Sequence, residues 1–145
     1  MAPMEQTGEG GSGTRGIFLT VYAVLFVVLG ISDCTKALQR IQNPEVGGLV
    51  VFGHKFMSIG TNAILGPIFG LILFSYAYGI WRMKRWVLPL SIAYAFYVPV
   101  NLVLFWSMRV GPPPSLNFIL FYLFVSLSGS IGTAIYLAYH RERLS

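Results

Sequence analysis

Two long stretches without a charged residue, at residues 56–81 and 86–108, limit what this chain can fold into. They contain 26 and 23 residues, and about 20 apolar residues are enough for a helix to span a bilayer. Further spanning helices are predicted at about residues 16–33 and 116–139. Only 10% of the chain is charged, whereas a soluble domain usually has about a quarter charged residues. We therefore predict an all-α, polytopic membrane protein with four transmembrane helices in an antiparallel bundle.

The short segment between the second and third predicted helices indicates how the chain is oriented. It carries three cations within four positions and a tryptophan at each end (Trp81, Arg82, Lys84, Arg85 and Trp86). Tryptophan rings favour the headgroup level, and short loops rich in Lys and Arg tend to stay in the cytoplasm. We interpret these five residues as membrane-interface anchors in a tight cytoplasmic turn. With four spans, both termini are then predicted to be cytoplasmic.

The first 14 residues differ in composition from the rest of the chain. They are rich in Gly, Ser, Thr and Glu and show no apolar periodicity, so residues 1–14 are predicted to form a disordered cytoplasmic tail. Residues 15–145 are predicted to form one four-helix transmembrane domain. An uncleaved first helix is favoured over a signal peptide, because no small-x-small cleavage site follows it.

The connection between the first and second helices is the least regular part of the chain. Ile31, Cys34, Leu38 and Ile41 share one helical face, which predicts an amphipathic extension of about two turns. Such an extension lies on the lipid or packs on the other helices, and packing is the more common outcome. Residues 46–55 form either an interfacial segment or an early start of the second helix. We favour the interfacial segment.

Polar residues inside the predicted spans define a candidate site. Folding the second and third helices about the basic turn places Asn62 and Asn101 in the outer half of the membrane. Asp33 is expected near the same outer edge. These three residues are the candidate outward-facing polar pocket. The alternative, and the more common case, is that each asparagine bonds a neighbouring helix or a carbonyl freed by Pro67 or Pro99, at about 0.6–2 kcal/mol per bond.

Small residues form a second pattern. Gly66 and Gly70 are spaced as GxxxG, and the last helix carries several small residues four positions apart (among Ser126, Ser128, Gly129, Ser130, Gly132 and Thr133). Such positions let two helices approach closely. Packing within the bundle is the favoured interpretation, and a homodimer face is the alternative.

Several classes of function lack the residues that they need. No ionisable residue is expected deep in a span, where ion-coupled transporters usually bind the coupled charge. His54 and His140 are predicted at opposite membrane faces, and Cys34 is the only cysteine, so no metal or cofactor site is expected. We predict no enzymatic activity. The net charge of +5 comes from cations at helix ends, so contact with the lipid bilayer explains it better than nucleic-acid binding does.

The segment Gly79 to Trp86 (GIWRMKRW) resembles the turn of small bacterial four-helix integral membrane proteins of unknown function. In those proteins a Gly-apolar-Trp-Arg segment ends one helix, and a basic-Trp pair begins the next. The resemblance covers about ten residues and the general four-span layout. It implies the bacterial inner membrane, and it implies no active site.

The predicted function is therefore that of a non-enzymatic small integral membrane protein. It is expected to be an accessory or self-associating component, which contacts a second copy or a larger membrane protein through its small-residue faces. The alternative is a small channel or permease that uses the outward-facing polar pocket. A stoichiometric partner in native membranes favours the first, and substrate flux in proteoliposomes favours the second.

Overall fold

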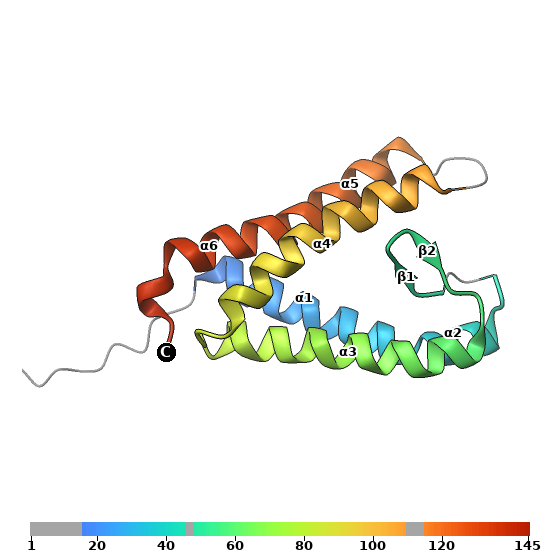
Figure 1. Cartoon of the computed structure of the whole chain (residues 1–145), viewed down its shortest axis with the longest axis horizontal. Helices are drawn as coiled ribbons and strands as arrows, with labels where there is room; N and C mark the ends of the chain where they lie inside the picture. The colour runs from blue at the N-terminus through green and yellow to red at the C-terminus, as the bar shows by residue number, and fades with distance from the viewer. Residues whose placement is uncertain (1–15, 46–47, 110–114) are drawn as a thin grey trace, which may run out of the picture.

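The computed structural model describes residues 16–45, 48–109 and 115–145, and it is mostly helical (Figure 1). Four helices are long and apolar enough to cross a membrane: α1 (Ile17–Cys34), α3 (Ile59–Trp81), α4 (Val87–Ser107) and a composite last helix, Leu116–Tyr139. Each end of these helices lies within three residues of the predicted span. The predicted tail at residues 1–14 lies outside the described part of the chain.

The composite last helix contains a wider, π-helical turn. It begins as α5 (Leu116–Leu127), passes through the π-helix η1 (Ser128–Gly132) and continues as α6 (Thr133–Tyr139). Serine side chains in this region bond to carbonyls of the preceding turn, which is a recognised way to distort a helix. Single π-helical turns are frequently found at functional sites.

The four long helices pack as two pairs. α1 lies against α3 over most of its length, and α4 packs against η1 and α6. Figure 1 shows the pairs meeting at the end that carries the α3–α4 turn and the C-terminus, and separating toward the other end. The apolar core contains the most deeply buried side chains of both pairs (Leu19, Phe26, Tyr76, Ile80 and Leu137). The separated ends of the helices leave room for a site.

Small residues explain the close approach of α1 and α3. A Cβ atom added to Gly66 would overlap the backbone carbonyl oxygen of Asp33, and one added to Gly70 would overlap Cys34 Sγ. In the last helix, Gly129 lies against the Tyr22 ring. The small-residue faces are therefore covered inside the chain. The contacts of Gly66, Gly70 and Gly129 favour packing within the chain, the interpretation preferred from the sequence.

The predicted extension after the first helix is present as α2 (Lys36–Gln42), and it contacts α3. The extension therefore packs on another helix, the outcome given as the more common one, but Leu38 and Ile41 do not make this contact. Leu38 and Ile41 are 59% and 60% exposed, whereas Arg40 is buried, with Nη1 3.7 Å from Met57 Sδ. A long arginine side chain covers apolar surface well. The apolar face of α2 is left on the outside of the molecule.

Residues 50–55 form a β-hairpin, which neither prediction for residues 46–55 anticipated. β1 (Val50–Val51) pairs antiparallel with β2 (His54–Lys55). The two turn residues, Phe52 and Gly53, have φ angles of 47° and 76°, as a type I′ turn requires. A short apolar run has no periodicity that separates helix from strand. Figure 1 shows the hairpin between the two separated helix pairs.

The α3–α4 turn is closed by a helix C-cap. The Lys84 N–H donates to the Gly79 carbonyl at 2.9 Å, and the Met83 N–H donates to the Ile80 carbonyl at 3.1 Å. This pair of bonds is the Schellman motif. Met83 occupies the left-handed position with φ 50°, where glycine is usual. The turn is thus a defined structure as well as a cluster of charges.

The C-terminal residues bind to this turn. The Ser145 N–H donates to the Met83 carbonyl at 2.8 Å, and the Arg85 N–H donates to the Ser145 carbonyl at 3.0 Å. Arg85 Nε also donates to the Leu144 carbonyl at 3.1 Å. The Leu144 side chain is buried in the core. We refer to these contacts of Leu144 and Ser145 as the C-terminal clamp. Arg85 therefore has a structural role in addition to its predicted role as an anchor.

Replacing Leu144 by alanine is expected to lower the free energy of unfolding by about 2–3 kcal/mol, because it leaves a cavity beside Met83. Equilibrium unfolding in mixed detergent micelles measures the change. The control is Leu120→Ala, since Leu120 is 56% exposed on α5, where the effect should stay within about 0.5 kcal/mol. Equal effects of the two substitutions would show that the clamp adds no stability.

Candidate functional site

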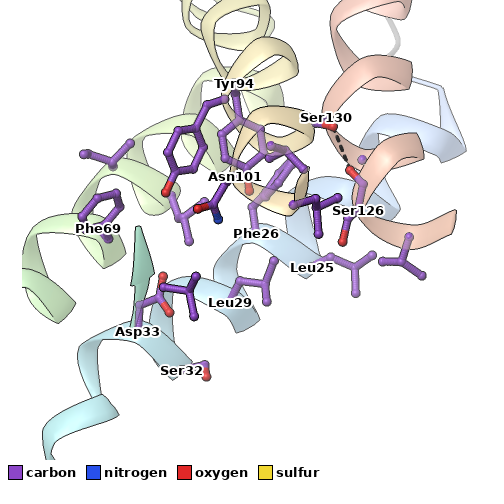
Figure 2. Close-up of a pocket in the computed structure, with 18 of the residues that line it drawn as sticks. Leu25, Phe26, Leu29, Ser32, Asp33, Phe69, Tyr94, Asn101, Ser126 and Ser130 are labelled. Carbon is purple, nitrogen blue, oxygen red and sulfur yellow. Dashed lines mark hydrogen bonds between the residues drawn. The ribbon is translucent and has the colours of Figure 1, made fainter. Parts of the chain in front are cut away.

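A cavity of about 670 Å³ lies between the two helix pairs, where they separate. Residues of α1, α3, α4, α5 and η1 line it, together with Lys36 of α2 and with Gly48, Leu49 and Val50 at the start of the hairpin. Figure 2 shows the side chains around this space. Its size falls in the range of about 300–1,000 Å³ that is usual for small-molecule sites.

Polar groups gather in one part of the cavity. Asp33 comes from the end of α1, and Tyr94, Tyr97 and Asn101 come from α4. Figure 2 shows the Asp33 side chain directed from α1 toward Asn101 and Tyr94. The remaining walls are mainly aliphatic and aromatic. The structure thus brings together two of the three predicted pocket residues, Asp33 and Asn101.

Asp33 is the second-to-last residue of α1. Its backbone carbonyl packs against Gly66, which is fifteen residues before Trp81. At 1.5 Å per residue this is about 22 Å from the basic turn. α1 ends one residue later, at Cys34, and Gly66 lets the backbones of α1 and α3 touch at this level.

The Asp33 carboxylate has no hydrogen-bond or ion-pair partner among the described residues. Lys36 lines the same cavity one helical turn further on, but its ammonium group does not come within the 4.0 Å that defines an ion pair. Two opposite charges therefore face the cavity separately. Buried or half-buried charges without partners are energetically costly.

Asn62 does not belong to the cavity, although the sequence placed it there. Its side chain is fully buried, and Oδ1 accepts a hydrogen bond from the Leu49 N–H at 2.8 Å. Nδ2 donates to the carbonyls of Phe56 and Ser58 at 2.8 and 2.7 Å. Asn62 therefore fixes the base of the hairpin to the first turn of α3. This is a structural role.

Asn101 lines the cavity and holds the tip of the hairpin. Its Oδ1 accepts a hydrogen bond from the Gly53 N–H at 2.9 Å. Gly53 lies so close to α4 that an added Cβ would be 2.6 Å from the backbone carbonyl carbon of Leu104. The Phe52 ring contacts the Tyr97 ring edge-on, with centroids 5.4 Å apart. The two predicted asparagines are thus joined through the hairpin.

The part of the cavity nearest the core is lined by the π-helical turn. The hydroxyl groups of Tyr22 and Ser128 are hydrogen-bonded to each other. Ser130 Oγ donates to the Ser126 carbonyl at 2.8 Å, as Figure 2 shows. Sequence reasoning did not assign these residues to the site. The concentration of serine and glycine between Ser126 and Gly132 was the available signal.

We infer that the cavity opens sideways between α1 and α5. Leu25, Val28 and Leu29 on α1, and Phe121 and Tyr122 on α5, line it and are also exposed at the outside of the molecule. The opening is therefore apolar. A hydrocarbon chain would be a better match for this entrance than a hydrated solute.

Among the residues that the structure describes, no group of three or more His, Cys, Asp or Glu side chains could hold a metal ion. His54 on β2 and His140 after α6 lie at opposite ends of the molecule (Figure 1). Cys34 packs toward Gly70 on α3.

The fold and the cavity together define the class of this protein. It has four helices of membrane-spanning length and composition, which is the pattern of a multi-pass membrane protein, and it has an internal cavity with an apolar side opening. Comparisons with protein-family models, with curated proteins and with solved structures gave no match. The class is therefore defined by the helices and the cavity themselves.

Proposed function

We propose that this chain is a multi-pass integral membrane protein that binds a small amphipathic molecule between its two helix pairs. The four long helices would form the antiparallel transmembrane bundle. The observation that supports this function is the cavity of about 670 Å³, which is mainly apolar, opens sideways and contains the unpartnered Asp33 carboxylate. A binding cavity of this kind is compatible with the alternative considered from the sequence, a small channel or permease.

The outer surface of the helices supports their insertion in lipid. Large apolar side chains are exposed along all of the long helices, including Ile17, Ile64, Phe96 and Phe124, which are 85%, 66%, 72% and 72% exposed. Apolar patches of this extent are normally covered by a membrane or by a partner. We place the basic turn and both described ends of the chain on the cytoplasmic side. The bacterial inner membrane follows from the resemblance at residues 79–86.

This placement puts Asp33 within the hydrocarbon region. Trp81 marks one membrane interface, and Asp33 lies about 22 Å from it, in a core about 30 Å thick. Ionisable residues at such depth usually face an interior cavity and mark a ligand or ion pathway. The position of Asp33 therefore favours a binding role over a purely structural one.

The accessory role predicted from the sequence would need a different contact surface. The small-residue faces are covered within the chain. A second copy or a larger membrane protein would have to contact exposed side chains instead, such as Phe118, Phe121 and Phe124 on α5. Lipid covers this kind of surface equally well. Ligand binding in the cavity is therefore the proposal with the more specific support.

The test fills the cavity. Ser126 lines it and is half-buried, so Ser126→Phe should displace a bound molecule, whereas Leu120→Phe on the exposed face of α5 should not. Each protein is purified from native membranes in a neutral detergent, and bound small molecules are identified by mass spectrometry. We expect an amphipathic molecule at near one-to-one stoichiometry with the wild type and Leu120→Phe, and its loss from Ser126→Phe.

Retention of the molecule by Ser126→Phe, with unfolding unchanged, would contradict binding in the cavity. A stoichiometric protein partner in place of a small molecule would support the accessory role. Flux of the identified molecule in proteoliposomes of the pure protein would extend the function from binding to transport.

A further inference from the structure

We infer that the cavity selects a zwitterionic phospholipid-type amphiphile, with its ammonium group at Asp33, its phosphate near Lys36 and its hydrocarbon chain between α1 and α5. This inference rests on the proposed function and adds the chemical class of the ligand.

The charged side chains of the cavity favour a zwitterionic ligand. Asp33 and Lys36 are the only charged residues among those that line the cavity in the described chain. Asp33 lies at the end of α1 and Lys36 at the start of α2, and they form no ion pair with each other. A ligand with one net charge would leave one of them without a partner. A zwitterion offers a partner to both and adds no net charge to an apolar site.

The end of the cavity near Asp33 suits an ammonium group. The rings of Tyr94, Tyr97 and Phe69 line the cavity there, and Figure 2 shows Tyr94 and Phe69 around the space that Asp33 faces. The faces of aromatic rings attract cations, including quaternary ammonium groups. The Asn101 amide oxygen is already occupied by the Gly53 N–H, so Asp33 is the stronger free acceptor.

The rest of the cavity suits a hydrocarbon chain. From Asp33 back to Leu25 is eight residues of α1, or about 12 Å of wall at 1.5 Å per residue. Leu25 and Leu29 line this wall, and Phe121 and Val125 line the facing side on α5. The side opening would admit the chain directly from the bilayer. The charged side chains thus lie toward one end of this wall and the apolar side chains along the rest of it, as the polar head and the hydrocarbon chain of an amphiphile require.

The test uses three probes that share a dodecyl chain and differ only in the head group: dodecylphosphocholine, dodecyltrimethylammonium and dodecyl phosphate. Each is titrated into the full-length protein in dodecylmaltoside, and binding is followed by native mass spectrometry. Dodecylphosphocholine should bind the wild type about tenfold tighter than either charged probe, since it alone pairs both side chains.

Single charge removals should redirect this preference. Asp33→Asn leaves Lys36, so dodecyl phosphate should become the preferred probe. Lys36→Gln leaves Asp33, so dodecyltrimethylammonium should become preferred. Lys55→Gln is the control, because Lys55 is exposed on β2 and does not line the cavity; it should keep the wild-type order.

The outcomes separate this inference from the proposed function. The inference of a zwitterionic ligand would be overturned if the wild type preferred either charged probe. It would also be overturned if Asp33→Asn and Lys36→Gln kept the wild-type order of affinities. In both cases the cavity would remain a binding site. If a variant fails to fold, the order of the wild-type affinities for the three probes still tests the inference. If Ser126→Phe binds all three probes as the wild type does, binding is not in the cavity and the proposed function fails.

Discussion

Replacing Gly66 by alanine is expected to lower the free energy of unfolding by about 2 kcal/mol, an effect typical of overpacked helix contacts. The added Cβ would overlap the carbonyl oxygen of Asp33, which is a backbone atom. A side chain could rotate away, but a backbone carbonyl can move only with its helix. α1 and α3 must therefore separate at this level, and the Asp33 carboxylate moves with them. Reduced ligand binding should accompany the loss of stability.

Gly60→Ala is the matched control in the same helix. The nearest atom to a Cβ added there is Ser58 Oγ at 3.8 Å, which is ordinary contact. Alanine is the better helix former by about 1 kcal/mol, so Gly60→Ala should be neutral or stabilising. Equilibrium unfolding in mixed micelles compares the two variants. If Gly66→Ala behaves as Gly60→Ala does, the close contact between α1 and α3 does not exist.

Replacing Asn62 by leucine should cost about 3 kcal/mol, because a buried group left without a hydrogen bond costs about 1–3 kcal/mol. The substitution removes three hydrogen bonds at a fully buried position and leaves the Leu49 N–H without an acceptor. The hairpin base should then separate from α3. Unfolding measures the energetic cost, and hydrogen exchange at residues 48–58 should show faster exchange there first.

The second asparagine provides the comparison. Asn101→Leu removes the single bond to Gly53 at the hairpin tip, so it should cost only about 1 kcal/mol and leave the base intact. Asn117→Leu is the control, since Asn117 is exposed near the start of α5; it should stay within about 0.5 kcal/mol. A cost for Asn62→Leu no greater than that for Asn101→Leu would contradict the structural role of Asn62.

The long helices were predictable because their signal is local. A run of about 20 apolar residues identifies a spanning helix without knowledge of its neighbours. The hairpin and the C-terminal clamp have no such local signal. Their key contacts join residues 48 positions apart, Gly53 with Asn101, and 59 positions apart, Arg85 with Leu144. Only the packing of the helices brings these residues together.

The candidate site was predictable only in part, because its polar residues can be recognised in the sequence but their contacts cannot. Asn62 and Asn101 are identical residues at similar predicted depths, so the sequence could not show that one supports the hairpin and the other lines the cavity. Asp33 interrupts an apolar run, and this placed it at the edge of the predicted span. α1 does end one residue later, at Cys34, but the sequence could not show that Asp33 and Asn101 line one cavity, because that depends on how the helices pack.

The C-terminal clamp has a consequence for how this protein is made. The α3–α4 turn leaves the ribosome about 60 residues before Leu144 and Ser145, whose backbone groups later bind Met83 and Arg85. Until then the turn lacks two of its backbone partners, and the core beside Met83 lacks the Leu144 side chain. The α1–α3 pair can therefore be inserted early, whereas the joined end of the molecule is completed only after synthesis of the last helix.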